Sequence, residues 1–233
     1  MRVSVLIPTK DRPERLWRAI AAVLSQDWSD LEVIVKDGGA HAAPLPHDAR
    51  VRRVDRDGTE DSISSALNAA AAVATGDVLH VACDDDEMLP GTIRSAVAAL
   101  DAGAEWTYGM LMFVEELPGG RLRDWTVDYE PWPWQPDEML NLNCVHQPTV
   151  FYRAELHRDL GGFDETFRWA HDYEWWGRLG AHAEPVSRQH FDAMYRMWPG
   201  STSVATPTVV EMEAQAIRAR WATLGLGRRP TDP

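Results

Sequence analysis

The sequence predicts an α/β fold in which a mostly parallel central sheet is covered by helices on both faces. Along the first half, short apolar runs rich in β-branched residues alternate with longer segments of helical periodicity. This alternation is typical of strand–helix–strand units with right-handed crossovers. Strands are expected at residues 2–8, 31–39, 51–54 and 77–82, and helices at 11–26, 62–76 and 90–103.

Local signals justify these elements one by one. The first strand, RVSVLIP, is apolar and stops at Pro8. The helix after it has Asp11 as a candidate N-terminal cap and Pro13 in its first turn, where both residue types are favoured. The segment 62–76 is rich in Ala, the strongest helix former.

The second half is less regular, and its elements are predicted from shorter signals. Strands are expected around the Pro-Gly-Gly turn within 104–128, followed by a Pro- and Trp-rich loop at 128–140. The remaining expected elements are a strand, a helix and a Gly turn at 147–164, a helix at 170–183, a strand at 186–198 and a helix at 208–226. Since neither a repeat nor a linker-like stretch interrupts the 233 residues, we expect a single domain.

Charge and composition limit the classes of function. The net charge is −13, from 23 basic and 36 acidic residues, which argues against electrostatic binding of nucleic acid or of an anionic membrane. Two cysteines, Cys83 and Cys144, are too few for a disulfide framework, and residues 1–13 lack the apolar segment of a signal peptide. No apolar run is long enough to cross a bilayer. We therefore expect a cytoplasmic protein.

An acidic cluster follows the strand expected at 77–82. Asp84, Asp85, Asp86 and Glu87 are adjacent in the sequence, and carboxylates this close repel one another. In parallel sheets, ligands bind beyond the carboxyl ends of the strands, which is where this cluster lies. The residues alone leave two interpretations open. The cluster is either a site for a hard divalent cation, which prefers oxygen ligands, or a solvated helix N-terminus, where the helix dipole favours carboxylates.

Three stretches, taken in order, resemble the family 2 glycosyltransferases of the GT-A fold. They are VSVLIPTKDRPERL (3–16), SALNAAAAVATGDVLHVACDDDEMLP (65–90) and GGFDETFRWAHDYEWWGRL (161–179). The resemblance implies a Rossmann-like three-layer sandwich that forms one GT-A domain over residues 1–233. The implied parts are a nucleotide-sugar-binding half at 1–103, an acceptor-side half at 104–205, and a C-terminal helix and tail at 206–233.

The resemblance also implies an activity. It is that of a metal-dependent, inverting glycosyltransferase, which moves a sugar from a nucleoside-diphosphate sugar to a hydroxyl of a saccharide or glycan precursor. The expected cofactor is Mn²⁺ or Mg²⁺, which neutralises charge on the leaving diphosphate. By its place in the motif, Asp86 is the implied metal ligand, with Asp84 as a second one. Asp84 and Asp85 are also expected to bind ribose hydroxyls or metal-bound water.

Further positions match the donor-binding motifs of the family. The residues implied to contact the nucleotide or its diphosphate are Pro8, Thr9, Arg12, Asp37, Asn68 and Arg196. Three of them have an equally simple structural interpretation. Asp37 can stabilise a β-turn, Arg12 can be a surface charge, and Asn68 can close the packing of its helix.

The acceptor side is implied by two stretches of the second half. Asp172 matches the general base that removes the proton of the acceptor hydroxyl, with Glu174 as the next candidate, although Asp172 can also be a helix cap. Trp132 and Trp134 lie among acids in the Trp-rich loop and are expected, with His171, to line the acceptor site. The alternative for both Trp residues is that they cover the sheet under a long loop.

Three departures from the family pattern keep other functions open. Lys36 and His171 replace acids, and Trp198 replaces a His that can complete the metal shell; His146 or His190 is a candidate substitute. One alternative function is therefore a nucleotide-sugar-binding protein without turnover. Another is a sugar-phosphate nucleotidyltransferase, which would need a Gly-rich loop with Arg and Lys where this chain reads PTKDRPERL.

Overall fold

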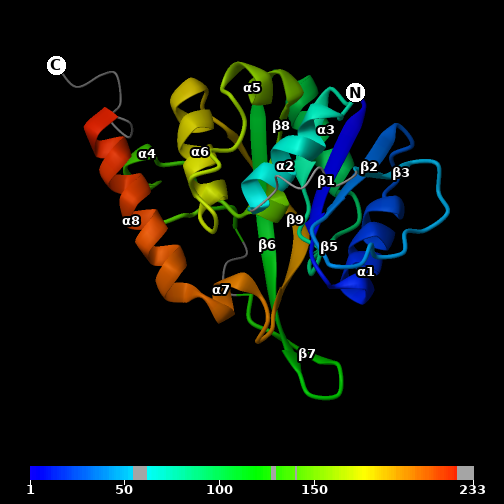
Figure 1. Cartoon of the computed structure of the whole chain (residues 1–233). Coiled ribbons are helices and arrows are strands. Elements are labelled where there is room, and N and C mark those ends of the chain that lie inside the picture. The colour runs from blue at the N-terminus through cyan, green and yellow to red at the C-terminus, as the bar shows by residue number, and fades with distance from the viewer. Residues whose placement is uncertain (55–61, 127–129, 140, 225–233) are drawn as a thin grey trace.

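The computed structural model describes residues 1–54, 62–126, 130–139 and 141–224, and it shows a central sheet between two layers of helices (Figure 1). Within these ranges, no helix is long and apolar enough to cross a membrane. The predicted C-terminal tail lies outside the described residues, as does part of the Trp-rich loop. The predicted α/β class with three layers is confirmed.

The strands and helices follow the predicted order closely. The strands are β1 (Val3–Thr9), β2 (Leu31–Asp37), β3 (Val51–Val54), β4 (Val78–Val81), β5 (Glu87–Met88), β6 (Trp106–Leu117), β7 (Arg121–Asp124), β8 (Phe151–Arg153) and β9 (Val186–Met197). The helices are α1 (Pro13–Leu24), α2 (Ile63–Ala72), α3 (Thr92–Asp101), α4 (Pro136–Met139), α5 (Ala154–Asp159), α6 (His171–His182), α7 (Thr202–Ala205) and α8 (Pro207–Leu224), with a 3₁₀ turn at Gln147–Thr149. The short elements β5, α4 and α7 carry too few residues to show a periodic pattern, and the sequence did not predict them.

The sheet consists of a parallel half and a mixed half. Its strand order is β3-β2-β1-β4-β8-β6-β9-β5, with β7 paired to β6. The strands β3, β2, β1 and β4 are all parallel, as the strand–helix pattern predicts. Beyond them, β8 is antiparallel to both β4 and β6, whereas β9 is again parallel to β6. One sheet therefore joins the two halves of the sequence.

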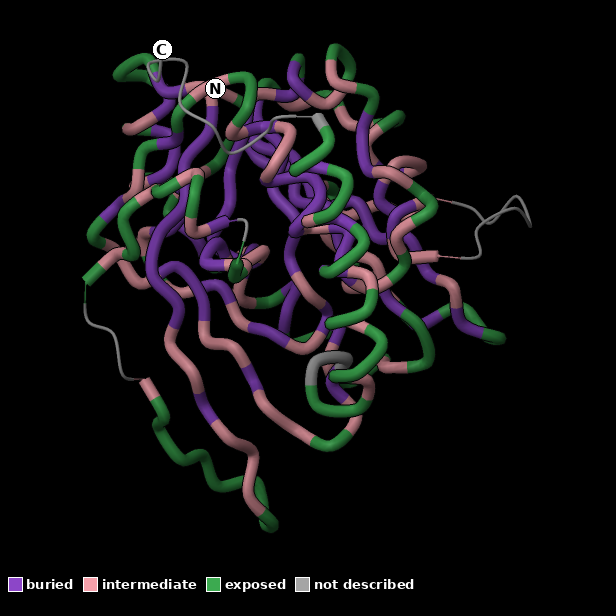
Figure 2. Tube along the Cα trace, turned by 90° about the vertical axis from the view of Figure 1, so that its left-hand side faces the viewer, coloured by how far each residue is buried: buried purple, intermediate pink, exposed green. Residues whose placement is uncertain are grey.

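The two faces of the sheet are buried by different helices. In β1, Val3, Val5 and Ile7 face α1 and α3, whereas Leu6 belongs to a second cluster with α2, α6 and α8. This alternation follows from the two-residue period of a strand. In Figure 2 the buried part of the trace runs through the centre of the molecule. Because each fully buried aliphatic side chain contributes about 1.5–3 kcal/mol, both faces stabilise the strands that end at the site.

The start of α1 differs from the prediction. The helix begins at Pro13, and its N-cap is Arg12, which makes no side-chain cap hydrogen bond. Asp11 has a left-handed backbone, with φ 55°, and its Oδ1 accepts the backbone N–H of Ala40 at 3.1 Å. Asp11 therefore holds the loop after β2 instead of capping the helix.

A buried histidine in β4 makes stability depend on pH. His80 is 1% exposed, stacks on Phe151 with ring centroids 4.1 Å apart, and its Nδ1 lies 2.8 Å from the carbonyl of Val150. Burial, with a smaller contribution from the Arg188 charge, lowers the pKa of His80 to about 4. In the unfolded chain the pKa is near the ordinary value of about 6.5. Between about pH 4 and about pH 6.5, the unfolded chain therefore binds a proton at His80 that the folded chain does not bind.

We predict that the free energy of unfolding falls as the pH is lowered from about 6.5 to about 4, with a His80 contribution of up to about 1.4 kcal/mol per pH unit. Urea titrations across this range measure the slope. In His80→Gln the slope should be smaller, and in the control His47→Gln, at an exposed position, it should match the wild type. An identical slope in His80→Gln and wild type would contradict the assignment of this pH dependence to His80.

Candidate functional site

The acidic cluster lies at the carboxyl end of β4 and is mostly buried. Asp84 is 5% exposed and Asp86 is 4% exposed. The next helix, α3, begins only at Thr92, after the two-residue strand β5. The structure argues against a solvated helix N-terminus, because Asp84 and Asp86 are buried and none of the four carboxylates lies in the first turn of α3.

Asp86 has one satisfied oxygen and one unsatisfied oxygen. Its Oδ1 accepts the backbone N–H of Arg196 at 3.0 Å. Its Oδ2 is buried and has no hydrogen-bond partner among the described residues. Burial, followed by the charge of Asp85, raises the pKa of Asp86 to about 8. A carboxylate oxygen in this state is costly unless a cation or a donor joins it.

Asp84 faces the first strand–helix loop. Its Oδ2 accepts the Thr9 hydroxyl at 2.7 Å, and its Oδ1 pairs with the Arg12 guanidinium at 3.1 Å. Burial and then the Asp85 charge raise the pKa of Asp84 to about 6, against the effect of these two partners. Thr9 and Arg12, both predicted at the donor site, are thus brought to the cluster.

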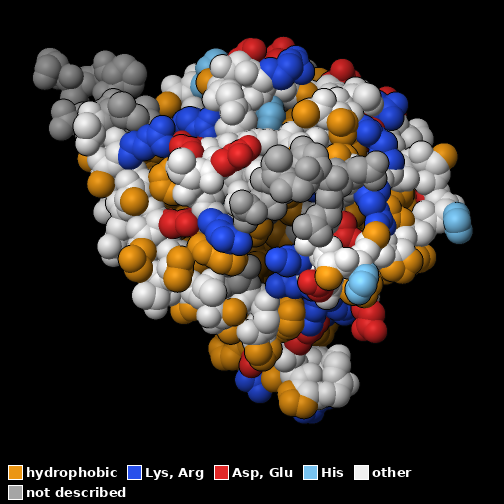
Figure 3. Space-filling view, in the orientation of Figure 1, with side chains coloured by type: hydrophobic (Ala, Val, Ile, Leu, Met, Phe, Trp, Pro, Cys, Tyr) orange, Lys and Arg blue, Asp and Glu red, His pale blue; other side chains and the backbone are white. Residues whose placement is uncertain are grey.

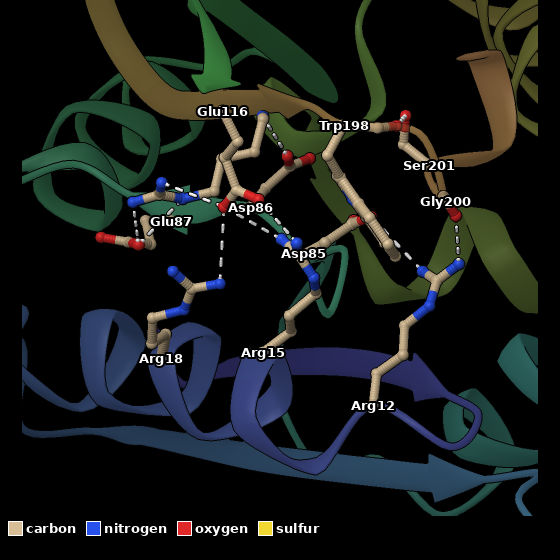
Figure 4. A network of polar contacts seen from close by, with 11 residues as sticks. Arg12, Arg15, Arg18, Asp85, Asp86, Glu87, Glu116, Trp198, Gly200 and Ser201 are labelled. Atoms are coloured by element: carbon tan, nitrogen blue, oxygen red, sulfur yellow. Dashed lines mark hydrogen bonds and ion pairs between the residues drawn. The ribbon is translucent and has the colours of Figure 1, made fainter. Parts of the chain in front are cut away.

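Asp85 is covered by the segment that follows β9 (Figure 4). Its Oδ2 accepts the indole N–H of Trp198 at 2.9 Å and lies 3.3 Å from Arg12. Arg12 also donates to the carbonyl of Gly200 at 2.8 Å. The guanidinium of Arg15 stacks on Trp198, 3.7 Å from the ring centroid. The residue that replaces the expected His is therefore held directly over the acidic cluster.

The cluster fits a hard divalent cation. Ligand atoms of Cys83, Asp85 and Asp86 lie within 4.8 Å of one another. Burial, followed by the Asp86 and Asp85 charges, raises the pKa of the Cys83 thiol well above its usual value. Hard divalent cations prefer oxygen ligands, so the carboxylate oxygens are the expected donors. The prediction that Asp84 is the second ligand needs correction, because both of its oxygens face Thr9 and Arg12; the structure groups Asp85 with Asp86.

A network of arginines and glutamates surrounds the cluster (Figure 4). The Arg196 guanidinium, predicted to reach the diphosphate, instead pairs with Glu87 at 2.5 Å and with Glu116 at 3.4 Å. Arg15 binds Glu116 through two hydrogen bonds of 3.1 and 2.6 Å. Arg18 lies 3.6 Å from the same carboxylate. Arg15, Arg18 and Glu116 were not predicted, although the three-residue spacing of Arg12, Arg15 and Arg18 places these arginines on one helix face.

The other predicted donor residues lie at two places. Pro8 and Thr9 end β1 beside the end of β2, in register with Lys36 and Asp37. The oxygens of Asp37 accept backbone N–H groups of Gly39 and Ala43, at 2.9 and 2.7 Å, so Asp37 stabilises its own loop at this edge.

Asn68 connects its helix to the second half of the chain, in line with its predicted alternative role in packing. Its amide donates to the carbonyl of Phe163 and accepts the N–H of the same residue, both at 2.9 Å. This pairing fixes α2 to the Gly-Gly-Phe turn of the second half. The amide is thus occupied by the backbone, and the structure does not direct it to a diphosphate.

Asp172 lies half-buried in the first turn of α6, where its Oδ2 accepts the side-chain N–H of Asn143 at 3.2 Å. The neighbouring His171 is 5% exposed, and burial lowers its pKa. Its Nε2 meets Gln147 at 2.9 Å, and Gln147 contacts Cys83 at 3.3 Å. This chain of contacts connects the start of α6 to the acidic cluster. The prediction of His171 as an acceptor contact needs correction, because its ring is buried.

The two predicted acceptor tryptophans have different environments. Trp132 is 42% exposed, and its N–H donates to Glu138 at 3.0 Å. Trp134 packs edge-on against the buried Trp106, with centroids 5.2 Å apart, and adjoins the core cluster under α6. Trp134 therefore packs against the core cluster, which supports the alternative interpretation that it covers the sheet.

The sequence of the chain is similar to those of known proteins. The model of the family described as glycosyl transferase family 2 matches residues 4–160. The uncharacterized protein y4gI of Sinorhizobium fredii is 25% identical over 218 residues, which are 87% of this chain and 23% of that protein. The GalNAc(5)-diNAcBac-PP-undecaprenol beta-1,3-glucosyltransferase of Campylobacter jejuni is 25% identical over 122 residues, which are 49% of this chain and 40% of that protein. The chain thus spans less than half the length of these two relatives.

Solved structures show the same fold. The 1–349 fragment of S. aureus TarS in complex with UDP-GlcNAc matches with a TM-score of 0.70 at 17% identity, over 94% of this chain and 66% of that one. The same fragment in complex with UDP matches with a TM-score of 0.65 at 16% identity, over 94% and 65% of the two chains. At this identity the likeness shows the architecture alone.

We predict that Asp86→Asn lowers the affinity for Mn²⁺ by about tenfold or more, because the amide removes the negative charge from the buried donor. Electron paramagnetic resonance of free Mn²⁺ measures this affinity. The Asn oxygen can still accept the Arg196 N–H, so the fold should persist. The control Asp101→Asn, at an exposed position, should bind Mn²⁺ as the wild type does. Equal affinity in the Asp86 variant and wild type would remove this carboxylate from the site.

Proposed function

The chain belongs to glycosyl transferase family 2, and from this premise we propose that it transfers a sugar from a nucleoside-diphosphate sugar to a hydroxyl group, with inversion at the anomeric carbon. The observation that carries the proposal is the buried Oδ2 of Asp86, which has no hydrogen-bond partner in the described part of the chain and lies beside Asp85, after the carboxyl end of a parallel strand. Such an edge is where open α/β sheets bind their ligands.

The donor is assigned to the edge formed by β1, β2 and β4. Thr9 and Asp37 are proposed to contact the nucleoside, and Arg12 the phosphates, because these side chains end at the same edge as the acidic cluster. Since TarS has been solved with UDP-GlcNAc, a UDP-sugar is the first donor to test.

The acidic cluster is proposed to hold Mn²⁺ or Mg²⁺. Asp86 and Asp85 are the residues that would hold the ion, with Asp84 contributing through ribose or water. When bound, the ion supplies positive charge that stabilises the leaving diphosphate. Arg12 lies against both Asp84 and Asp85 and adds a fixed positive charge on the same side.

Asp172 is proposed as the general base. Inverting transfer needs a carboxylate on the acceptor side, which takes the hydroxyl proton while the oxygen bonds to the anomeric carbon and the bond to the diphosphate breaks. The hydrogen bond from Asn143 orients the carboxylate of Asp172 and leaves its other oxygen for the proton. The acceptor is proposed to be a saccharide or glycan precursor.

A second candidate is a nucleotide-sugar-binding protein without turnover. The observation that favours it is the Trp198 N–H on Asp85, which occupies a carboxylate that the metal would use. The family match disfavours the third alternative, a sugar-phosphate nucleotidyltransferase.

Calorimetry with UDP-, GDP- and dTDP-sugars, with and without Mn²⁺, tests the donor site. Proton NMR of the sugar anomeric signal then follows hydrolysis or transfer. Metal-dependent binding with a slow anomeric conversion would support the transferase, and binding without any conversion would support the second candidate. Absence of binding for all three nucleotides would refute both.

We predict that Asp172→Asn lowers turnover by about 10²–10⁴, because the amide keeps the size of the side chain but cannot accept the proton. The donor dissociation constant should change little. Steady-state rates and calorimetry measure the two quantities separately. Asp101→Asn, at an exposed position, is the control variant. Glu174→Gln is less suitable, because Glu174 accepts hydrogen bonds from Arg178 and its substitution would also affect folding. Normal turnover in Asp172→Asn would assign the base elsewhere.

A further inference from the structure

A largely apolar hollow lies beside the acidic cluster and is lined by residues of the β6–β7 hairpin, the residue that follows it, and the segment that leads from β9 into α7. Its volume is about 640 Å³, enough for a small oligosaccharide or a drug-sized molecule. The apolar side chains that line it include Phe113, Trp125, Met197, Trp198 and Val204. Two carboxylates, Glu115 and Glu116, complete the lining.

The aromatic walls of the hollow are held in place by polar contacts. Trp125 is 49% exposed, yet its N–H donates to Glu115 Oε2 at 2.9 Å, and Arg123 pairs with the same oxygen at 3.3 Å. On the opposite wall, Trp198 is fixed by Asp85 and by the Arg15 stack. The two indole rings are therefore oriented before any ligand arrives, which reduces the entropy cost of binding.

The hollow is continuous with the proposed donor site. Trp198 belongs to both, since its ring lines the hollow and its N–H contacts Asp85. On the inner wall, Phe113 packs edge-on against His146, with centroids 5.4 Å apart. His146 lies in the segment that also carries Asn143, the partner of Asp172. The hollow is thus connected by a contact to Asp85, and one of its lining residues contacts the segment that carries the partner of the proposed base.

The lining of the hollow contains two carboxylates, Glu115 and Glu116, and no Lys or Arg among the described residues. Glu116 is paired with Arg15, and its other partners are Arg18 and Arg196, which lie behind the lining. Within the described residues, Trp125 and Arg123 both contact the Glu115 carboxylate at Oε2. An anionic ligand in the hollow would therefore face two carboxylates. Indole faces can cover the C–H faces of a sugar ring, and a carboxylate oxygen can accept its hydroxyl groups.

We propose that this hollow is the acceptor subsite, and that it takes a neutral saccharide whose ring packs on Trp125 and whose hydroxyl groups donate to Glu115. The proposal rests on the proposed function, because it names the acceptor of that same reaction. It replaces the Trp132 and Trp134 loop as the predicted acceptor wall, since Trp134 is partly buried against the core cluster.

Ligand-observed NMR on the full chain, saturated with UDP and Mn²⁺, tests the subsite. The probes are a neutral set (maltose, cellobiose, lactose and chitobiose), an anionic sugar (glucose 6-phosphate) and an apolar one (1-octanol). We expect at least one neutral disaccharide to bind, and we expect Trp125→Ala to weaken that binding by about tenfold, the equivalent of losing one aromatic face. Glu115→Gln should weaken it by about threefold or more, as one charged hydrogen bond is lost.

Trp17→Ala is the matched control, because Trp17 lies outside the hollow, on α1, and is 43% exposed. Its indole N–H donates to the carbonyl of Pro44. This variant should bind the disaccharide as the wild type does. Equal affinity in Trp125→Ala and wild type, binding of octanol or glucose 6-phosphate alone, or no binding of any neutral probe would each overturn the proposal. Calorimetry of UDP with Mn²⁺ is run on the same samples. Absence of binding of UDP, and also of GDP and dTDP, in the wild type would refute the proposed function itself, whereas normal UDP binding with a failed saccharide result would refute only the subsite.

Discussion

The site depends on one hydrogen bond, in which the Asp86 carboxylate accepts the backbone N–H of Arg196. Asp86 directly precedes β5, which pairs with β9, so the bond continues this pairing and ties the segment that follows β4 to β9. Because both groups are buried, loss of either partner would leave the other unsatisfied, at a cost of about 1–3 kcal/mol. The bond also sets the direction of Asp86 and places Trp198, two residues further along the chain, over Asp85.

The surrounding charges explain why an acidic chain can hold an anionic donor. The net charge is −13, but the residues around the cluster include Arg12, Arg15, Arg18 and Arg196, each within ion-pair distance of a carboxylate. In Figure 3 acidic and basic side chains are likewise interspersed on the visible face. At physiological ionic strength, fields are screened within about 8 Å, so a bound diphosphate would experience this local set of charges far more than the total.

Much of the fold, and part of the site, could be predicted from the sequence. The strands β1, β2 and β4 and the helices between them have clear periodicity, and the strand ends bring Thr9 and Asp84 together as expected. The role of Asp11 in the loop after β2, the pairing of β5 with β9 and the partners of Glu116 could not be predicted. These depend on contacts between residues distant in the chain, about which local patterns carry no information. For Trp134, the tertiary packing against Trp106 decided between two interpretations that the sequence left equal.

The β6–β7 hairpin extends away from the body of the molecule (Figure 1), and within the described chain β7 pairs only with β6. Its turn contains Gly119 and Gly120, both exposed and both with positive φ, 81° and 75°. The acidic cluster that follows β4 lies at a different part of the sheet. Insertions or substitutions at this turn would reshape one wall of the neighbouring hollow without displacing the acidic cluster. Under the proposed acceptor subsite, the residues of the donor site and those that select the acceptor lie in separable stretches of the chain, so a change confined to this hairpin would alter acceptor preference and leave the donor site intact.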